Sequence, residues 1–324
     1  MRRVLVLGGT GWLGREVARA ARDGGAEVTC LARGESGDVP DGTQLVRADR
    51  SLPGAYDRVK GEWDDVVELA SEPQLVQSAL DALAPRAAHW TLVSTVSVYA
   101  DDGTPGDDES AEVVEPRDLT RYADAKVNAE RVSRTLLQDR LLIARPGLIA
   151  GPGDPSDRFG YWPARLHRGG RVLVPTTDRR FVQYIDVADL AAWIVTAGAN
   201  RITGTVNAVG PAHTMDDFFR AAGRVAEFNG SLITVDDKTL LDDGVQYWAG
   251  SRSLPLWLPT EAAGFAQRDG AAFIATGGRP RSLQDTLIRV LADELSRGRD
   301  RPRRAGLTAA EERELLANSP LARR

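Results

Sequence analysis

The chain has 324 residues, of which 42% are hydrophobic and 27% charged, a composition typical of a folded α/β protein with one large domain or two. Its net charge of −5 gives no general attraction to nucleic acid or anionic membranes, and no apolar stretch approaches the length of a membrane-spanning helix. The single cysteine, Cys30, excludes an internal disulfide and the three scattered histidines offer no metal-ligand spacing, so we expect a cytoplasmic protein without a metal site.

The first expected element is a buried parallel strand at residues 4–7, an uninterrupted apolar run that ends in a glycine-rich turn. Three glycines follow with G-x-x-G-x-x-G spacing, and a helix-forming segment begins directly after them. In such a unit Gly8 permits the tight turn, Gly11 lets backbone approach a phosphate, and Gly14 lets the helix pack against the strand. The unit predicts a dinucleotide site. Its expected cofactor-binding residues are Gly8, Thr10, Gly11, Trp12, Leu13 and Gly14.

The second strand is expected at residues 27–32, and the residues that end it bear on the type of cofactor. An NAD site usually has an acid about 20 residues after the glycines, where it accepts hydrogen bonds from the ribose hydroxyls. This chain has Ala32 followed by Arg33. We therefore expect that no carboxylate there repels a 2′-phosphate. The Arg33 guanidinium could pair with such a phosphate through two hydrogen bonds. The prediction is NADP, with NAD as the alternative and a solvated loop arginine as the simpler interpretation of Arg33.

Two further strands, at residues 44–48 and 65–70, continue the alternation, and a helix follows the second of them. Asp49 comes directly after the first, where its carboxylate could accept a hydrogen bond from an adenine amino group. Ala70 ends the other and is expected in the same cofactor site. Strands that alternate with helices at this interval predict an α/β fold with a Rossmann-type, doubly wound parallel sheet.

The fifth strand, β-branched and aromatic at residues 90–99, should end at the carboxyl edge of the sheet, where ligands bind in this architecture. After a polar loop, Tyr122 and Lys126 are four residues apart in a helix-forming segment, on the same helix face. An ammonium beside a phenol favours the phenolate and lowers the tyrosine pKa, which makes the phenol a proton donor and acceptor usable near neutral pH. Two residues at this spacing can also be an ordinary pair on the protein surface. The interpretation as a catalytic pair therefore depends on its position after a hydroxyl-bearing strand in a chain with a dinucleotide-binding turn.

Taken together, these motifs resemble the extended short-chain dehydrogenase/reductase superfamily, whose members include NAD-dependent epimerase/dehydratase-type proteins. The motifs are the glycine turn at 8–14, the strand end at 94–99 and the Tyr122–Lys126 pair. Three later segments agree with this resemblance. Residues 144–153 resemble the family's loop beside the nicotinamide, and residues 180–189 resemble the segment that leads into its late core helix. Residues 205–209 resemble its last core strand. The resemblance extends to about residue 295 and is weakest across 228–280.

The resemblance implies a role for each matching polar residue. Tyr122 would be the acid/base, Lys126 its modulator and a ligand of the nicotinamide ribose, and Thr95 the hydroxyl that bonds the substrate oxygen. The residues implied to contact the cofactor on this side are Ser94, Tyr122, Lys126, Pro146 and Gly147. The family's nucleotide-sugar 4,6-dehydratases carry Thr-Asp-Glu where this chain has Thr95, Val96 and Ser97, so elimination of water is disfavoured.

The leading functional hypothesis is an NADP-dependent oxidoreductase that transfers a hydride between the nicotinamide and a carbonyl or secondary alcohol of a small molecule. A nucleotide-sugar epimerase with tightly bound cofactor is the alternative within the enzymes, although only Arg180 could serve its diphosphate. A non-catalytic nucleotide- or RNA-binding relative is the alternative from another class. The acidic composition and the retained Thr95, Tyr122 and Lys126 favour an enzyme over that alternative.

The domain organisation follows from the same segments. We expect a dinucleotide-binding domain at residues 1–150, completed by about 181–210, and a smaller C-terminal substrate domain at 151–180 and 211–297. The aromatic, proline-rich stretch 254–259 is expected in the core of that domain or in a lid over an apolar substrate. Residues 298–324 form an expected tail with a short helix, surface-packed or partly free, with arginines at Arg299, Arg301, Arg303 and Arg304. No nucleic-acid or membrane partner is expected, and a homodimer is possible.

Overall fold

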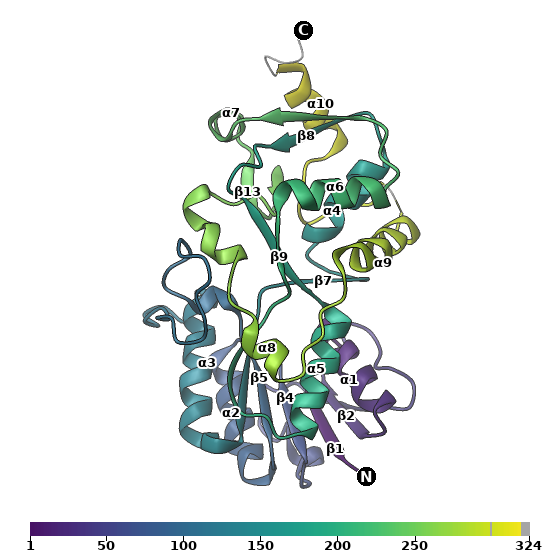
Figure 1. Cartoon of the computed structure of the whole chain (residues 1–324). Coiled ribbons are helices and arrows are strands. Elements are labelled where there is room, and N and C mark those ends of the chain that lie inside the picture. Colours follow the sequence, from purple (N-terminus) through teal and green to yellow (C-terminus); the bar gives the residue numbers. More distant parts are fainter. Residues whose placement is uncertain (299, 319–324) are drawn as a thin grey trace. The chain divides into compact units, whose positions relative to one another are not determined.

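The computed structural model describes residues 1–298 and 300–318, which form two compact units (Figure 1). Unit 1 consists of Met1–Leu148, Ile185–Gly210 and Arg268–Pro280. Unit 2 consists of Ile149–Tyr184, Pro211–Gln267 and the described part of Arg281–Arg324. The chain therefore returns to the unit of the glycine turn for residues 268–280 before its C-terminal part packs within the other.

Unit 1 is built on a seven-stranded sheet in the order β10-β6-β5-β4-β1-β2-β3, in which every neighbouring pair is parallel. The strands are β1 (Arg3–Leu7), β2 (Glu27–Ala32), β3 (Gln44–Arg47), β4 (Asp65–Glu68), β5 (Trp90–Val93), β6 (Leu141–Pro146) and β10 (Gly204–Ala208). Residues 4–7 are fully buried, as expected for a strand covered by helices on both faces. The sheet confirms the predicted Rossmann-type, doubly wound fold.

Helices cover both faces of this sheet. Helices α1 (Trp12–Asp23) and α5 (Val187–Ala199) pack together on one face, and α2 (Pro73–Leu83) and α3 (Tyr122–Leu137) on the other (Figure 1). The shorter helical segments are η1 (Asp57–Val59), η2 (Ala84–Arg86), η3 (Val96–Val98), η4 (Gln138–Arg140) and α8 (Ala271–Ala275). The strand order reverses between β1 and β4, so the loops leaving their carboxyl ends diverge and open a crevice at that edge.

Strand β5 is shorter than the sequence predicts, because it ends at Val93 rather than continuing to Tyr99. The Thr95 hydroxyl oxygen accepts a hydrogen bond from the Ser97 N–H at 3.2 Å and caps the 3-10 helix η3. A side-chain acceptor of this kind competes with strand pairing, which β-branched residues alone would favour. Thr95 therefore lies just beyond the sheet edge, in a turn.

Unit 2 combines small sheets and helices around an aromatic core. Its strands are β7 (Leu148–Ala150), β9 (Phe181–Asp186) and β11 (Ala212–Thr214) in one sheet, β8 (Arg171–Pro175) with β12 (Ser231–Val235), and β13 (Gln246–Trp248) with β14 (Ser253–Pro255). Its helices are α4 (Arg158–His167), α6 (Met215–Val225), α7 (Asp237–Asp242), η5 (Thr260–Ala266), α9 (Leu283–Ser296) and α10 (Ala309–Asn318). Phe159, Trp162 and Phe218 are fully buried, and burial of such large rings stabilises the unit.

The proline-rich stretch 254–259 belongs to this core. Leu254 and Trp257 are completely buried, and the Trp162 Nε1–H donates to the Pro255 carbonyl oxygen at 2.6 Å. The hydrogen bond satisfies the polar edge of a buried indole. The stretch therefore packs inside unit 2 rather than forming an exposed apolar lid.

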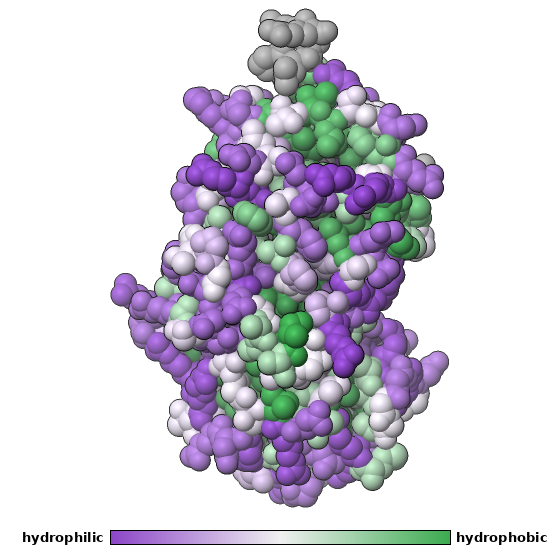
Figure 2. Space-filling model, viewed as in Figure 1, coloured by the Kyte–Doolittle hydropathy of each residue, from purple (hydrophilic) through white to green (hydrophobic). Residues whose placement is uncertain are grey.

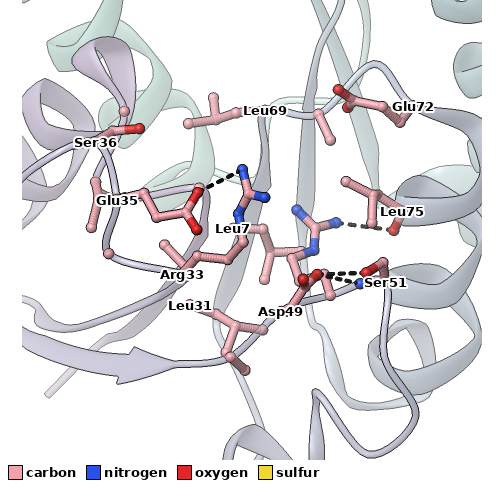
Figure 3. A pocket seen from close by; sticks show the side chains of 18 residues that line it. Leu7, Leu31, Arg33, Glu35, Ser36, Asp49, Ser51, Leu69, Glu72 and Leu75 are labelled. Atoms are coloured by element: carbon pink, nitrogen blue, oxygen red, sulfur yellow. Dashed lines mark hydrogen bonds and ion pairs between the residues drawn. The ribbon is translucent and has the colours of Figure 1, made fainter.

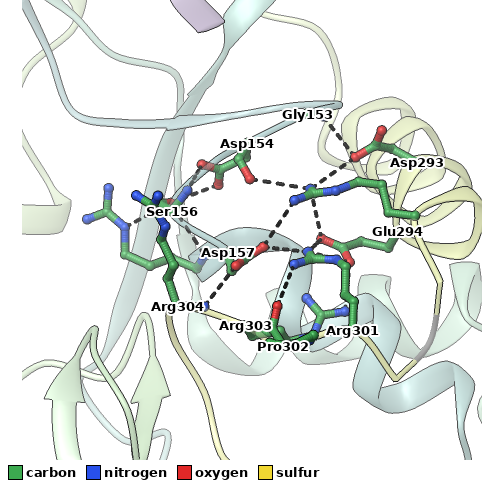
Figure 4. Close-up of polar contacts among 12 residues, drawn as sticks. Gly153, Asp154, Ser156, Asp157, Asp293, Glu294, Arg301, Pro302, Arg303 and Arg304 are labelled. Atoms are coloured by element: carbon green, nitrogen blue, oxygen red, sulfur yellow. Dashed lines mark hydrogen bonds and ion pairs between the residues drawn. The ribbon is translucent and has the colours of Figure 1, made fainter. Parts of the chain in front are cut away.

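The C-terminal segment of unit 2 is tied down by ion pairs (Figure 4). Arg301 pairs with Asp157 and with Glu294, and Arg303 Nη2 donates to Glu294 Oε2 at 2.7 Å. The two carboxylates are at most 4% exposed, and buried carboxylates require cationic partners. Arg301 and Arg303 are thus held in ion pairs, whereas the arginines of a free tail would be solvated. Arg299 lies outside the described residues.

The face of the molecule that Figure 2 shows is mostly hydrophilic, with small apolar areas. One exposed apolar side chain is Ile274 of α8, which is 55% exposed. Within residues 1–298 and 300–318, no helix combines the length and apolar character needed to cross a bilayer.

Candidate active site

The glycine turn is held by close backbone contacts. Gly8 has φ of +95°, a left-handed conformation that favours glycine. A Cβ added to Gly14 would lie 2.3 Å from the Gly8 carbonyl oxygen, so only glycine lets α1 approach the turn this closely. Gly11 is the N-cap of α1. Sequence analysis missed Gly9, where an added Cβ would lie 2.4 Å from the Cys30 Sγ on β2. The turn therefore offers backbone N–H groups and a helix N-terminus to an anion.

A cavity of about 470 Å³ opens at the carboxyl ends of β1, β2, β3 and β4 within unit 1 (Figure 3). This volume falls in the range of small-molecule sites, about 300–1,000 Å³. Six residues predicted to bind the cofactor line it, namely Gly8, Thr10, Gly11, Arg33, Asp49 and Ala70. Its lining does not include the other predicted residues Trp12, Leu13, Gly14, Ser94, Tyr122, Lys126, Pro146 and Gly147. The fold thus brings the adenosine-side predictions into one cavity.

One premise of the cofactor prediction is wrong, because a carboxylate does lie in the cavity beyond β2. Glu35 lines the cavity with Arg33, and the two form an ion pair with 3.2 Å between Nη2 and Oε2 (Figure 3). Both side chains are more than 60% exposed, so water weakens the pair. Arg15 Nη1 donates to the carbonyl oxygens of Thr10 and Ser36, each at 2.8 Å, and ties this loop to the glycine turn.

Asp49 lies at the cavity wall directly after β3. Its Oδ1 accepts hydrogen bonds from the Ser51 N–H at 2.9 Å and the Ser51 hydroxyl at 2.7 Å (Figure 3). These bonds hold the pKa of the Asp49 carboxyl below its ordinary value, and the charge of Arg33 adds to the effect. Asp49 is therefore an ionised acceptor in the cavity at neutral pH.

A buried ion pair that sequence analysis missed lies at the same wall. Arg50 pairs with Glu68 through two nitrogens, Nη1 to Oε1 at 3.0 Å and Nη2 to Oε2, and Nη2 also donates to the Leu75 carbonyl oxygen at 3.0 Å. Glu68 is fully buried and accepts the Ala70 N–H at 2.8 Å. The signal in the sequence was Glu68 itself, because an acid at the end of an apolar strand needs a cationic partner once buried.

Lys126 links this cavity to the end of β5. Its Nζ donates to the carbonyl oxygen of Ala70, a cavity residue, at 2.9 Å and to that of Val93, the last residue of β5, at 2.7 Å. The side chain is only 3% exposed, and burial lowers the pKa of the ammonium to about 8, against the opposing effect of Glu68 and Glu72. Lys126 is therefore a cation at neutral pH that loses its charge in mildly alkaline solution.

Tyr122 is the first residue of α3 and is 54% exposed, whereas Lys126 one turn later is buried. Asp124 fixes the start of this helix, because its Oδ2 accepts hydrogen bonds from the N–H groups of Arg117 and Asp118, both at 2.9 Å. These bonds hold the pKa of the Asp124 carboxyl below its ordinary value. The position of Tyr122 thus depends on a side chain that sequence analysis passed over.

The two neighbouring hydroxyls at the end of β5 have different partners. Ser94 Oγ donates to Glu130 Oε1 at 2.6 Å, and Arg145 holds the same carboxylate with distances of 2.9 Å and 2.6 Å. Thr95 Oγ1 donates to the Ser97 hydroxyl at 3.2 Å. Ser94 therefore belongs to a buried charge network, whereas Thr95 has only a neutral neighbour that a ligand oxygen could replace.

Pro146 is the last residue of β6, the neighbour of β5 in the sheet, and Gly147 follows it. A Cβ added to Gly147 would lie 3.3 Å from Val209 Cγ1, so the backbone is closely packed there. These residues share the carboxyl edge of the sheet with Thr95. In the part of the chain that the structure describes, no group of three histidine, cysteine or acidic residues could hold a metal ion.

Known proteins resemble this chain in sequence over the same region. Residues 4–209 match the family described as "NAD dependent epimerase/dehydratase family". The chain is 26% identical over 239 residues to the Mus musculus "Epimerase family protein SDR39U1", an alignment that covers 68% of this chain and 80% of that protein. It is 30% identical over 213 residues to the "dTDP-4-dehydrorhamnose reductase" of Streptomyces griseus, which covers 64% of this chain and 68% of that protein.

Solved structures resemble the fold across almost the whole chain. UDP-N-acetylglucosamine 4-epimerase from Bacillus cereus has a TM-score of 0.69 at 16% identity, covering 94% of this chain and 100% of that one. UDP-glucuronic acid 4-epimerase from the same organism, in complex with NAD, has a TM-score of 0.67 at 14% identity, covering 91% and 99%. Identities this low support the fold alone. The sequence match, which spans the glycine turn and the Tyr122–Lys126 pair, shows that the chain belongs to the NAD dependent epimerase/dehydratase family of the extended short-chain dehydrogenase/reductase superfamily.

Proposed function

We propose that the protein is an NADP-dependent oxidoreductase that transfers a hydride between the nicotinamide and a carbonyl or secondary alcohol of a small molecule. The observation that carries this proposal is the position of Lys126. Its ammonium bonds to the Ala70 carbonyl oxygen at the cavity and to the Val93 carbonyl oxygen at the end of the strand that leads to Thr95. One buried cation thus joins the cavity to the strand end where the substrate oxygen would bind.

The residues around the cavity fit a dinucleotide. The close approach at Gly8 and Gly14 leaves room for a phosphate against the backbone, and the N-terminus of α1 favours its negative charge. Asp49 supplies an acceptor for the adenine amino group, and Lys126 supplies a donor for the nicotinamide ribose. When bound, the nicotinamide supplies the hydride chemistry.

The residues of the chain bind the substrate oxygen and move the proton. In the reductive direction Tyr122 gives its phenolic proton to the carbonyl oxygen, and the Thr95 hydroxyl holds the same oxygen with a second hydrogen bond. The positive charge of Lys126 favours the phenolate that remains on Tyr122. Because Asp124 sets where α3 begins, it positions the phenol for this step.

The preference for NADP rests on Arg33. Its ion pair with Glu35 is exposed and therefore weak, whereas a 2′-phosphate offers several charged acceptors to the same guanidinium. Glu35 acts in the opposite sense, because its carboxylate is able to accept hydrogen bonds from the two ribose hydroxyls of NAD. The balance between these two side chains sets the cofactor preference.

A sugar-nucleotide epimerase is the second candidate, favoured by the fold it shares with the two 4-epimerases. The surroundings of Arg180 count against it. Its Nη1 donates to the Thr176 carbonyl and hydroxyl oxygens at 2.8 Å and 2.7 Å, its Nε to the Leu258 carbonyl oxygen at 2.9 Å, and its Nη2 pairs with Asp237. An arginine held this way inside unit 2 has no donor pair left to clamp a diphosphate.

The test begins with fluorescence titrations of NADPH and NADH into the purified protein. Ketones, aldehydes and nucleotide sugars are then supplied while nicotinamide absorbance is followed. Stoichiometric consumption of NADPH supports an oxidoreductase, and conversion of a nucleotide sugar without net consumption supports the epimerase. Tyr122→Phe removes one hydroxyl, so turnover should fall roughly 10²–10⁴-fold while cofactor affinity survives. Wild-type turnover in Tyr122→Phe, or no cofactor binding at all, would overturn the proposal.

A further inference from the structure

The strand β12 of unit 2, which leads into α7 (Figure 1), has an open edge. Within the described residues it pairs with β8 alone, so it ends a two-stranded parallel sheet. The Ser231 N–H donates to the Gly170 carbonyl oxygen, on the β8 side, at 3.0 Å. Because successive residues of a strand direct their backbone groups to opposite sides, Ile233 also bonds toward β8. The N–H and carbonyl groups of Leu232 and Thr234 therefore point to the edge without a neighbouring strand.

The outer edge of β8, by contrast, is closed. The Leu173 N–H donates to Glu312 Oε1 of α10 at 3.1 Å, and Arg165 Nη2 donates to the Arg171 carbonyl oxygen at 2.6 Å. Pro175, the last residue of β8, has no N–H. Proteins protect exposed sheet edges by covering them or by placing charges and prolines on them. β12 has the sequence SLITV, without a charge or a proline, so this edge lacks that protection.

The side chains beside the open edge are exposed and uncharged. Leu232 is 41% exposed, and Thr234 is exposed as well. Both line a groove of about 580 Å³, which Phe219 of α6 and Phe228 also line. The charged lining of this groove is balanced between two acids and two arginines, Asp216, Glu227, Arg220 and Arg224. An open strand edge beside a groove without excess charge favours an uncharged strand as its partner.

We propose that β12 pairs with β12 of a second copy of this chain, antiparallel and with Ile233 on the two-fold axis. The register follows from the outward backbone groups. Leu232 lies opposite Thr234 of the second copy, and such a pair exchanges both of its N–H···O bonds. The two-fold axis repeats this pair, so the sheets of the two copies join in the order β8-β12-β12-β8. The proposal does not depend on the reaction assigned to unit 1.

The charges at the ends of β12 favour a second copy in this orientation. Asp236 and Asp237 directly follow the strand, whereas the uncharged Gly230 precedes it. In the antiparallel register Asp236 lies opposite Gly230 of the second copy, so the acids of the two copies are at opposite ends of the strand pair. A parallel arrangement would place like charges opposite each other, which is destabilising. On the groove face, Leu232 of each copy lies next to Thr234 of the other and loses exposed apolar surface.

A cysteine on the two-fold axis tests the register. At a position without hydrogen bonds, opposite residues of an antiparallel pair have Cα atoms about 4.5 Å apart, within the ~4.4–6.8 Å of a disulfide. Ile233→Cys should therefore form a disulfide between two copies under mild oxidation. Leu232→Cys is the matched control, because its equivalent in the second copy lies two residues out of register, and it should cross-link at least tenfold more slowly. The native Cys30 is buried and gives no background.

Sedimentation of the full chain measures the association itself, which should depend on concentration because the contact is small. Thr234→Pro removes an N–H that β8 does not use, and Ile233→Lys places two like charges on the axis, so each should weaken dimerisation at least tenfold. Ile274→Lys, the same change at a 55% exposed position of unit 1, should dimerise as wild type does. A wild type that is monomeric at every concentration overturns the proposal. Dimers that persist in both β12 variants, or equal cross-linking of the two cysteine variants, overturn it as well.

Discussion

Replacing Lys126 by methionine tests how the buried ammonium is used. Burial lowers its pKa from an ordinary 10.5 to about 8, which disfavours the charged folded protein at neutral pH by about 3 kcal/mol, at ~1.4 kcal/mol per pKa unit. Methionine has similar length and no charge, but it leaves the Ala70 and Val93 carbonyl oxygens without this donor, at roughly 0.5–1.5 kcal/mol each. The variant should therefore be as stable as wild type or more stable by up to about 2 kcal/mol, and inactive.

The pH dependence isolates the ammonium from packing effects. Because the pKa of Lys126 is lower in the folded than in the unfolded state, the unfolded chain binds more protons between about pH 8 and 10.5, and wild-type stability rises with pH across that window. Below pH 8 both states hold the proton and the contribution is constant. Urea unfolding at about pH 7 and about pH 9.5 should show wild type gaining about 2 kcal/mol relative to Lys126→Met.

A stability difference between the two proteins that is the same at both pH values would refute the reasoning, because it would mean that Lys126 keeps its proton throughout. Turnover near the wild-type rate in Lys126→Met would refute the role of the charge in catalysis. With the wild-type enzyme, kcat/KM should fall above about pH 8 as the ammonium loses its proton, and this decline is measured on the free enzyme at low substrate.

Three other changes address the cofactor loop, the start of α3 and the C-terminal segment. Arg33→Ala should weaken NADPH binding on the order of tenfold and leave NADH binding nearly unchanged, whereas Glu35→Gln should strengthen the preference for NADPH. Fluorescence titration measures the affinity of each variant for each cofactor. If Arg33→Ala loses affinity for both cofactors equally, Arg33 does not bind the 2′-phosphate. Asp124→Ala should lower kcat in steady-state assays while cofactor affinity persists. Asp124→Asn, which keeps an acceptor oxygen, should retain most of the wild-type kcat. Arg301→Ala should destabilise the protein by about 3 kcal/mol in urea unfolding, whereas the exposed Arg220→Ala should change stability by less than about 1 kcal/mol.

Much of unit 1 could be predicted because its signals are local. The apolar run at 4–7 is long enough for a strand, and the spacing of Gly8, Gly11 and Gly14 specifies a turn whose contacts lie within a few residues. The Rossmann-type fold was therefore predicted correctly from the order of such units. The end of β5 was placed wrongly, at residue 99 instead of Val93, because the β-branched residues favour a strand while the Thr95 hydroxyl accepts a hydrogen bond from the Ser97 N–H and starts a 3-10 helix.

The candidate site also contains features that local sequence predicts and features that depend on tertiary packing. Tyr122 and Lys126 share a helix, so their spacing was enough to put both on α3, yet nothing in the spacing shows that one is exposed and the other buried. That difference comes from the sheet beneath α3, where the ammonium donates to the carbonyl oxygen of Val93, the last residue of β5, and to that of Ala70, two residues after β4. The roles proposed for Thr95, Tyr122 and Lys126 remain predictions until the variants are measured.

The sequence by itself determined the strand–turn–helix units, their order in a parallel sheet and the family to which the chain belongs, because these depend on residues close together in the chain. Only the tertiary structure decided which charges meet. It paired Arg50 with Glu68 and brought Arg301 to Asp157, 144 residues earlier in the chain. It also placed Glu35 beside Arg33 in the cavity at the carboxyl ends of β1, β2, β3 and β4. A charged residue inside an apolar segment of the sequence predicts that an oppositely charged partner exists. The identity of that partner depends on the packing between distant segments, because many oppositely charged residues satisfy the same electrostatic requirement.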